Sequence, residues 1–416
     1  MDTVTRRRFL LASGVTGAAG LAAGAAALDH RTLQLRAAET PLAGDANVLV
    51  LVTLYGGNDG LNTVVPYGDK AYQDGRPDLA YAESAVHRLG DGLGLNPALK
   101  GMAGLWAERR LAIVRGVGYP RPDFSHFRSM DIWQTASPTT PVPTGWIGRW
   151  LDATGDDPVR AVNVGSVLAP AAVGARCTAA ALDADQARLR AAFAPAVTQL
   201  AVPASGEKPA RAAVRTSYRN ERTVATTFAT ALGPSAPRQG SGQGGGASRK
   251  AGHSGQSSNA LADQLTFVGR CVRAGVPTRV YLVSLGGFDT HADEKGTQEK
   301  LLSTLDEAVA GFVTDMAADE RGRRVVVAVY SEFGRRVVAN GGDGTDHGTA
   351  GPVFVAGAPV RGGFYGEQPS LTDLDDGNLK SSVDFRAVYG ELVHRVLASD
   401  PHAVLDTVPA ELGFLA

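Results

Sequence analysis

Residues 325–357 read VVVAVYSEFGRRVVANGGDGTDHGTAGPVFVAG, and this stretch decides the fold. The continuous apolar run at 325–330 is typical of a fully buried strand, and Glu332 follows its carboxyl end. A loop rich in Gly and Asp then carries Asp346 and His347 to the start of a second apolar run at 352–356. Ligands in open α/β sheets bind beyond the carboxyl ends of strands, so this order predicts a site here. The alternative is an acidic turn followed by an ordinary surface loop.

Two further apolar runs end in the same way. Residues 47–55 are followed by two glycines and Asp59, and residues 278–285 are followed by two glycines, Asp289 and His291. Asp59 could equally serve the turn alone, because Asn-Asp-Gly suits a turn conformation. An amphipathic helix expected at 299–321 leads directly into the strand at 325, which predicts βαβ units. The pattern predicts an α/β fold with a mostly parallel central sheet flanked by helices.

A further strand is expected at 111–117, and a helix begins shortly after it. Ser125 precedes that helix, where its hydroxyl can cap the helix or act as a nucleophile beside the helix N-terminus. His126 could be a base, a phosphate contact or an ordinary helix residue. Ser129, one turn later, is the other candidate hydroxyl.

The composition excludes some functions. The net charge is -1 over 416 residues, so no general basic field points to nucleic acid as a partner. The two cysteines, Cys177 and Cys271, could form a disulfide or remain buried thiols. There is no Cys-x-x-Cys, which argues against a thiolate zinc site.

The N-terminus has the features of an export signal. Arg6, Arg7 and Arg8 precede Phe9-Leu10 and an apolar, small-residue run, as in signals read by the twin-arginine export machinery. The alternative is an uncleaved membrane anchor. No later apolar run reaches the ~18 residues of a spanning helix, so we expect an exported protein without a stable membrane span.

The remaining chain is expected to form one domain. Residues 1–40 are assigned to the signal and spacer, and residues 41–416 to the α/β domain. Residues 179–232 are Ala-rich and expected to be mostly helical. Residues 234–259 are rich in Gly, Ser and Gln, which predicts a flexible low-complexity insertion.

Carboxylates and imidazoles thus gather at one predicted edge of the sheet. Such a set suits a divalent metal, whether Zn²⁺, Mn²⁺, Mg²⁺ or Ca²⁺, that polarises an ester oxygen or activates water or a serine. Arg335 is a candidate for binding an anionic group. The candidate metal ligands are Asp59, Asp289, His291, Glu332, Asp346 and His347.

The sequence also resembles a known family. Residues 54–66 (LYGGNDGLNTVVP), 125–136 (SHFRSMDIWQTA), 286–291 (GGFDTH) and 331–348 are similar to bacterial Domain of Unknown Function 1501 proteins. The resemblance implies an alkaline-phosphatase-like or sulfatase-like fold and export by the twin-arginine route. The resemblance also implies roles from the metal-site pattern of the alkaline phosphatase and sulfatase superfamily. In that pattern Asp59 would be a ligand, Ser125 the nucleophile and His347 the last histidine.

Two positions depart from that pattern. His291 stands at a different spacing from Asp289, and Glu332-Phe333-Gly334 replaces Asp-His-Gly, so Phe333 removes a ligand. A single-metal or inactive site is therefore an alternative to the usual two-metal site. We expect an exported metal-dependent hydrolase of phosphate or sulfate esters that acts on an anionic small-molecule or glycan ester. The alternatives are a non-catalytic exported binding or scaffold protein and, with less support, an oxidoreductase.

Overall fold

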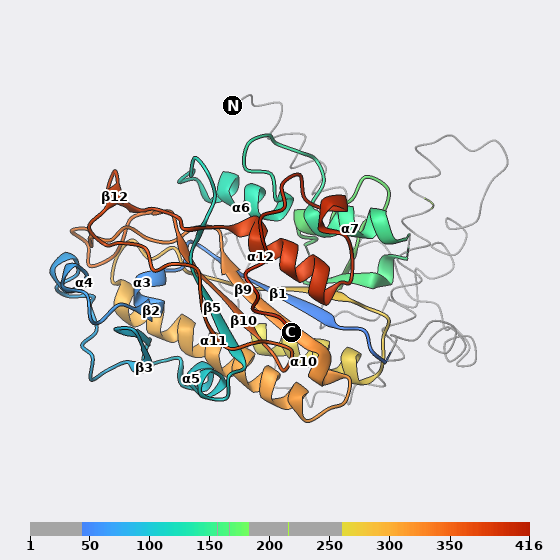
Figure 1. The fold of residues 1–416 in the computed structure, drawn as a ribbon, viewed down its shortest axis with the longest axis horizontal. Coiled ribbons are helices and arrows are strands. Elements are labelled where there is room, and N and C mark those ends of the chain that lie inside the picture. The colour runs from blue at the N-terminus through green and yellow to red at the C-terminus, as the bar shows by residue number, and fades with distance from the viewer. Residues whose placement is uncertain (1–43, 156, 166, 183–214, 216–259) are drawn as a thin grey trace, which may run out of the picture.

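The apolar runs of the sequence form the strands of one mixed sheet (Figure 1). The computed structural model describes residues 44–416 except 156, 166, 183–214 and 216–259. Within these residues the sheet has nine strands in the order β11-β5-β10-β9-β1-β8-β6-β7, with β14 paired to β5. The strands are β1 Val48–Tyr55, β5 Leu111–Gly118, β6 Ala161–Val164, β7 Ala180–Leu182, β8 Val280–Gly286, β9 Val325–Ser331, β10 Gly351–Ala356, β11 Gly363–Tyr365 and β14 Val383–Asp384. The predicted α/β class is confirmed.

The strand directions bring separate loops to one edge. β1 pairs in parallel with β8 and with β9, and β6 continues the parallel set beside β8. β10 is antiparallel to both β9 and β5. β5 therefore points the same way as β9, and the start of β10 lies at the edge where β1, β5, β8 and β9 end. The loop preceding β10 joins that edge, as the sequence predicted.

Both faces of the sheet are covered by helices. Along β1, Val50 and Val52 belong to one buried apolar cluster, whereas Leu49 and Leu51 belong to another on the opposite face. Side chains alternate across a strand, so a strand buried on both sides is apolar throughout. Figure 1 shows one helix group on each side of the strands. One group is α5 Lys100–Ala107, α10 Ala260–Arg273 and α11 Glu294–Ala317, and the other is α6 His126–Thr135, α7 Trp146–Thr154 and α12 Phe385–Glu391.

Smaller elements surround the end of β1. Helix α3 (Gly60–Thr63) follows it, and β2 (Val64–Val65), β4 (Leu93–Leu95) and β3 (His87–Gly90) form a three-stranded sheet. The polar stretch at 67–81 predicts a loop, but α4 (Lys70–Gly75) forms there because Asp69 caps its first turn. Residues 180–182 form strand β7 although helix was expected, because they extend the sheet beside β6. β12 (Leu374–Asp375) and β13 (Asn378–Leu379) form a separate hairpin.

Several sequence predictions fall outside the described residues. These are the export signal at 1–40, most of the helical region at 179–232 and the insertion at 234–259. In the part of the chain that the structure describes, no helix is both long and apolar enough to cross a membrane. Cys177 and Cys271 form no disulfide, because they are buried in apolar clusters on opposite faces of the sheet.

A buried charged network lies behind the loop edge. Arg76 forms an ion pair with Asp59, and neither side chain is exposed. Arg76 also donates to the carbonyl oxygens of Arg336 and Val337, 2.6 and 2.8 Å away. Burial opposes ionisation of Asp59, but the charge of Arg76 outweighs it and lowers the pKa of Asp59. Burial and the nearby negative charge of Asp59 raise the pKa of Glu294 to about 9.

Glu294 therefore makes folding dependent on pH. Its pKa is higher in the folded chain than the ordinary value of 4.5, so its stabilising contribution is complete below pH 4.5 and is lost as pH rises towards 9. In the wild type, the free energy of unfolding should fall by up to about 1.4 kcal/mol per pH unit in this range. We predict that Glu294→Gln, which mimics the protonated acid, removes this fall. Urea unfolding of both proteins at pH 5, 7 and 9 measures this loss. The exposed Glu320→Gln is the control, and equal pH profiles for wild type and Glu294→Gln would contradict the prediction.

Candidate functional site

Four chain segments meet at the carboxyl edge of the parallel strands. His126 begins α6 shortly after β5, Asp289 follows β8, and Glu332 follows β9 directly. His347 precedes β10, whose antiparallel direction places its start at the same edge. The sheet topology therefore brings together side chains that are far apart in the sequence.

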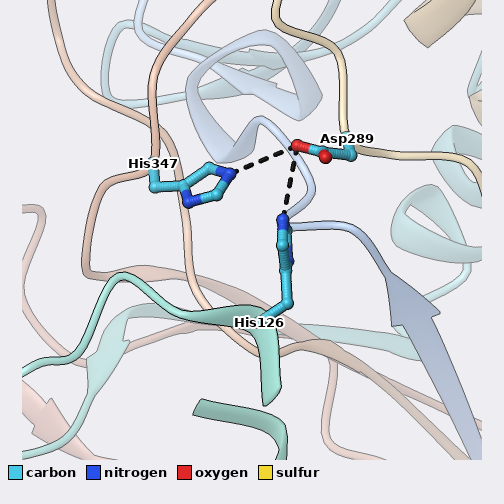
Figure 2. Close-up of side chains that lie close together, drawn as sticks. All are labelled: His126, Asp289 and His347. Carbon is cyan, nitrogen blue, oxygen red and sulfur yellow. Dashed lines mark hydrogen bonds and ion pairs between the residues drawn. The ribbon is translucent and has the colours of Figure 1, made fainter. Parts of the chain in front are cut away.

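Asp289 lies at the centre of this group (Figure 2). Its Oδ1 is 3.3 Å from Nε2 of His126, 3.2 Å from Nε2 of His347 and 3.0 Å from Nε2 of His291. Partial burial opposes its ionisation, but the hydrogen bond from Arg335 lowers the pKa of Asp289 to about 2. Asp289 is therefore a carboxylate at neutral pH, and three imidazoles face one of its oxygens.

The outer nitrogens of two imidazoles are fixed by acceptors. Nδ1 of His126 is 2.8 Å from Oε1 of Glu332, and Nδ1 of His347 is 2.7 Å from the carbonyl oxygen of Phe124. Both partners accept hydrogen bonds, so we assign the proton to Nδ1 in each ring. In the neutral form each ring would direct the lone pair of Nε2 towards Asp289, whereas the hydrogen bond with Glu332 raises the pKa of His126 and favours its protonated form in the absence of an ion. Nε2 of His126 is buried and makes no hydrogen bond with any described residue.

His291 extends the group on its exposed side. Its Nε2 is 2.9 Å from Nε2 of His347, and its Nδ1 is 3.4 Å from Oδ1 of Asp346. Asn340 holds this pair by donating to Oδ1 of Asp346 and to the carbonyl oxygen of His291, at 3.1 and 3.0 Å. Asp346 thus supports His291 from behind and does not face Asp289.

This donor set fits a metal ion. The ligand atoms of His126, Asp289 and His347 all lie within 4.8 Å of one another. A tetrahedral site with bonds of 2.0–2.2 Å places its ligand atoms roughly 3.3–3.6 Å apart, close to the 3.0–3.3 Å that separate Asp289 from the imidazoles. Burial lowers the pKa of His347, which favours the neutral ring that a metal ligand needs. Outer acceptors on ligating histidines are a regular feature of metal sites.

Arg335 supports the site from within the protein. Its side chain is fully buried and donates to the carbonyl oxygens of Gly56, Gly57, Phe288 and Thr345. It also donates to Oδ1 of Asp289 at 3.0 Å. The sequence predicts that Arg335 binds an anion, but in the structure its donors contact the protein itself. Gly56 has φ +118°, and a Cβ there would lie 2.4 Å from the backbone nitrogen of Asp289, so only glycine allows this approach.

The two candidate hydroxyls have different surroundings. Ser129 is fully buried, and its Oγ donates to the carbonyl oxygen of Asp123 and accepts from the hydroxyl of Tyr119. Ser125 is exposed and its side chain makes no capping hydrogen bond. It stands between Phe124, whose carbonyl oxygen accepts from His347, and His126. Of the two, Ser125 is the one available to a substrate.

The remaining predicted ligands lie behind the group. Glu332 is 1% exposed, and its Oε1 also accepts from the backbone nitrogen of Gly56, so it faces His126 and the protein interior. Asp59 is 0% exposed and its oxygens accept from Arg76 and from the backbone nitrogen of Leu61. These contacts place Glu332 in a supporting position and Asp59 in the buried network.

Phe333 occupies the position where the superfamily pattern has a histidine. Its ring is buried and lies 4.9 Å from that of His126 and 4.8 Å from that of His347, centre to centre. It packs beneath both imidazoles and offers no ligand atom. Across the described ranges, one cluster of residues has metal-binding geometry.

The structure therefore brings Asp289, His291 and His347 together as the sequence indicated, and it adds His126. From the sequence, His126 was a candidate base or phosphate contact and was not among the candidate metal ligands. The signal that could have identified it was its position at the start of a helix that follows a strand of the same edge.

Solved structures resemble this fold at low identity. Ps i-CgsB in complex with k-i-k-neocarrahexaose has 10% identity and a TM-score of 0.41, covering 87% of this chain and 74% of that chain. The C-terminal periplasmic domain of EcEptC from Escherichia coli, in complex with Zn, has 9% identity and a TM-score of 0.35, covering 76% of each chain. A protein in the alkaline phosphatase superfamily from Vibrio parahaemolyticus has 11% identity and a TM-score of 0.36, covering 81% and 71%. TM-scores below 0.5 carry no information on the activity of this chain. A search of curated proteins gave no match.

The sequence itself matches the profile of a family described as protein of unknown function (DUF1501), over residues 145–407. Asp289, His291, Glu332 and His347 lie inside the matched range, whereas Ser125 and His126 precede it. The match extends over more than half of the chain, and the resemblance noted in the sequence is confirmed. The chain belongs to the DUF1501 family.

Proposed function

We propose that this chain is an exported, metal-dependent hydrolase of phosphate or sulfate esters. The observation that carries the proposal is the convergence of imidazole Nε2 atoms on Oδ1 of Asp289, with an acceptor fixing the Nδ1 of each ring. A metal ion between the rings and the carboxylate would satisfy these lone pairs together, in place of the proton that the raised pKa of His126 favours. Export is proposed from the arginine-rich, apolar N-terminal sequence.

His126, Asp289 and His347 would hold the ion, with His291 as a fourth donor. A set rich in imidazole favours Zn²⁺ over Mn²⁺, Ca²⁺ and Mg²⁺, which prefer oxygen ligands. When bound, such an ion would supply a positive charge that polarises an ester oxygen and favours deprotonation of a nearby hydroxyl.

Ser125 supplies the nucleophile in this proposal. Its hydroxyl is exposed directly before the first residue of α6, where the helix N-terminus adds positive potential for the anionic end of a substrate. Oγ of Ser125 would form a bond to phosphorus or sulfur while the bond to the leaving oxygen breaks, and the proton of the hydroxyl would pass through solvent to that leaving oxygen. Water would then attack the same phosphorus or sulfur atom, the bond to Oγ would break, inorganic phosphate or sulfate would leave, and Oγ would regain a proton from the attacking water. Throughout the reaction, Glu332 and the carbonyl oxygen of Phe124 would accept hydrogen bonds from Nδ1 of His126 and His347, so that these protons stay on Nδ1.

The first prediction of the proposed function concerns metal content and turnover. The purified protein should carry about one divalent ion per chain, and Asp289→Ala should lose it. Ser125→Ala should keep the ion and lower kcat on 4-nitrophenyl phosphate or 4-nitrophenyl sulfate by at least about 10³-fold. Elemental analysis and a turnover assay of the same preparations measure both.

The matched control is Ser129→Ala, which removes a buried hydroxyl without touching the exposed one. A wild-type protein that takes up no Zn²⁺, Mn²⁺ or Ca²⁺ would refute metal dependence. A metal-loaded wild type without turnover on either ester class would instead support the non-catalytic binding protein.

A second prediction concerns Glu332. Glu332→Gln keeps the size of the side chain but removes the charge that orients His126, so metal affinity should fall by about 10- to 100-fold. Asp346→Asn should have a smaller effect, because Asp346 is 58% exposed and its contact with His291 is 3.4 Å long. Competition with a chelating dye gives both affinities, and thermal unfolding of the metal-free proteins checks that the fold is intact. Unchanged affinity in Glu332→Gln would show that Glu332 does not support a ligand.

A further inference from the structure

Two exposed phenylalanines flank the proposed nucleophile. Phe127 is 89% exposed and Phe124 is 42% exposed. Among the described residues, the other exposed large hydrophobic side chains are Tyr55, Val167 and Val338. Phe124 and Phe127 are thus the two members of this group that lie close together in the sequence, three positions apart. Leaving an apolar ring exposed gives up the stabilisation that its burial would bring, and this loss is nearly complete at Phe127. Exposed apolar groups that gather beside a polar site are typical of ligand binding.

Both phenylalanines are close in sequence to histidines proposed as ligands. The carbonyl oxygen of Phe124 lies 2.7 Å from Nδ1 of His347, so this residue is bound directly to one proposed ligand. Phe127 immediately follows His126, another proposed ligand, in the first turn of α6. Ser125 lies between them. In the four consecutive residues 124–127, the two exposed phenylalanines therefore stand on either side of the two residues that the proposed reaction uses.

The charges around the rings favour an uncharged part of the substrate. Arg128, the next residue, is paired with Asp131 in an i,i+3 ion pair and is 19% exposed. Asp123 accepts a hydrogen bond from the backbone nitrogen of Ser125. The positive charge available to an ester would be that of the ion between the histidines. The apolar surface offered by Phe124 and Phe127 suits the part of the substrate that carries no charge.

We propose that Phe124 and Phe127 form a stacking platform for the ring that bears the ester group. This inference rests on the proposed function and narrows its substrate class. The substrates would be esters on a ring that has an apolar face, either a planar aryl ring or a pyranose. Small alkyl esters would bind less tightly. A planar aromatic side chain contacts such a face over a wide area with little loss of side-chain freedom.

Equilibrium binding of two phosphonates tests the platform without requiring turnover. Isothermal titration of the Zn²⁺-loaded protein should show that phenylphosphonate binds roughly tenfold more tightly than methylphosphonate. In a Phe124→Ala, Phe127→Ala double variant this preference should disappear, while the affinity for methylphosphonate and the zinc content stay unchanged. The matched control, Phe124→Tyr with Phe127→Tyr, keeps both rings and should keep the preference.

Equal binding of both phosphonates to the wild type would overturn the platform while leaving the proposed function intact. A preference that survives in the double alanine variant would also overturn it. Binding of neither phosphonate to the zinc-loaded protein would overturn the platform and count against the proposed hydrolase as well. Competition by phenyl sulfate and by galactose 4-sulfate against phenylphosphonate then distinguishes an aryl ring from a sugar ring.

Discussion

The guanidinium of Arg335 is the interaction on which the functional edge of this protein depends. It is buried, permanently charged, and donates to carbonyl oxygens in the segments after β1 and β8 and in the loop before β10. It also binds Asp289. Buried carbonyl oxygens without partners are costly, so one side chain fixes the relative positions of three loops that carry or border the ligands. The site is built on backbone contacts as much as on its own side chains.

Much of the fold could be predicted from the sequence because it depends on local composition. Continuous apolar runs at β1, β8 and β9 indicated strands buried on both faces, and glycines with acids after each run indicated the functional edge. Asp289 and His347 were predicted correctly as neighbours, since parallel strands place their carboxyl ends together. The elements that differed, α4 and β7, are short and depend on a cap or on a neighbouring strand.

The roles within the site could not be predicted because they depend on contacts between distant segments. Asp59 and Asp289 both follow a strand and two glycines, yet Asp59 is buried against Arg76 and Asp289 faces the histidines. The difference arises from Arg76, in a loop whose path the sequence does not reveal. Glu332 faces inward because Gly56 and His126 both contact its carboxylate. Whether an acid binds an ion directly or supports a ligand is decided by such contacts.

The separation of the contributing segments along the chain has a consequence for how the site forms. Phe124 and His347, joined by one hydrogen bond, are 223 positions apart. A partly folded chain cannot hold these groups together, because closing so long a loop costs entropy that only the finished sheet offsets. An ion whose ligands come from segments between β5 and β10 would bind only the completely folded chain. Binding would therefore shift the equilibrium between unfolded and folded chains towards the folded one. Occupancy of the proposed metal site would then indicate that the polypeptide has finished folding. Complete folding matters for any export route that transports proteins already folded.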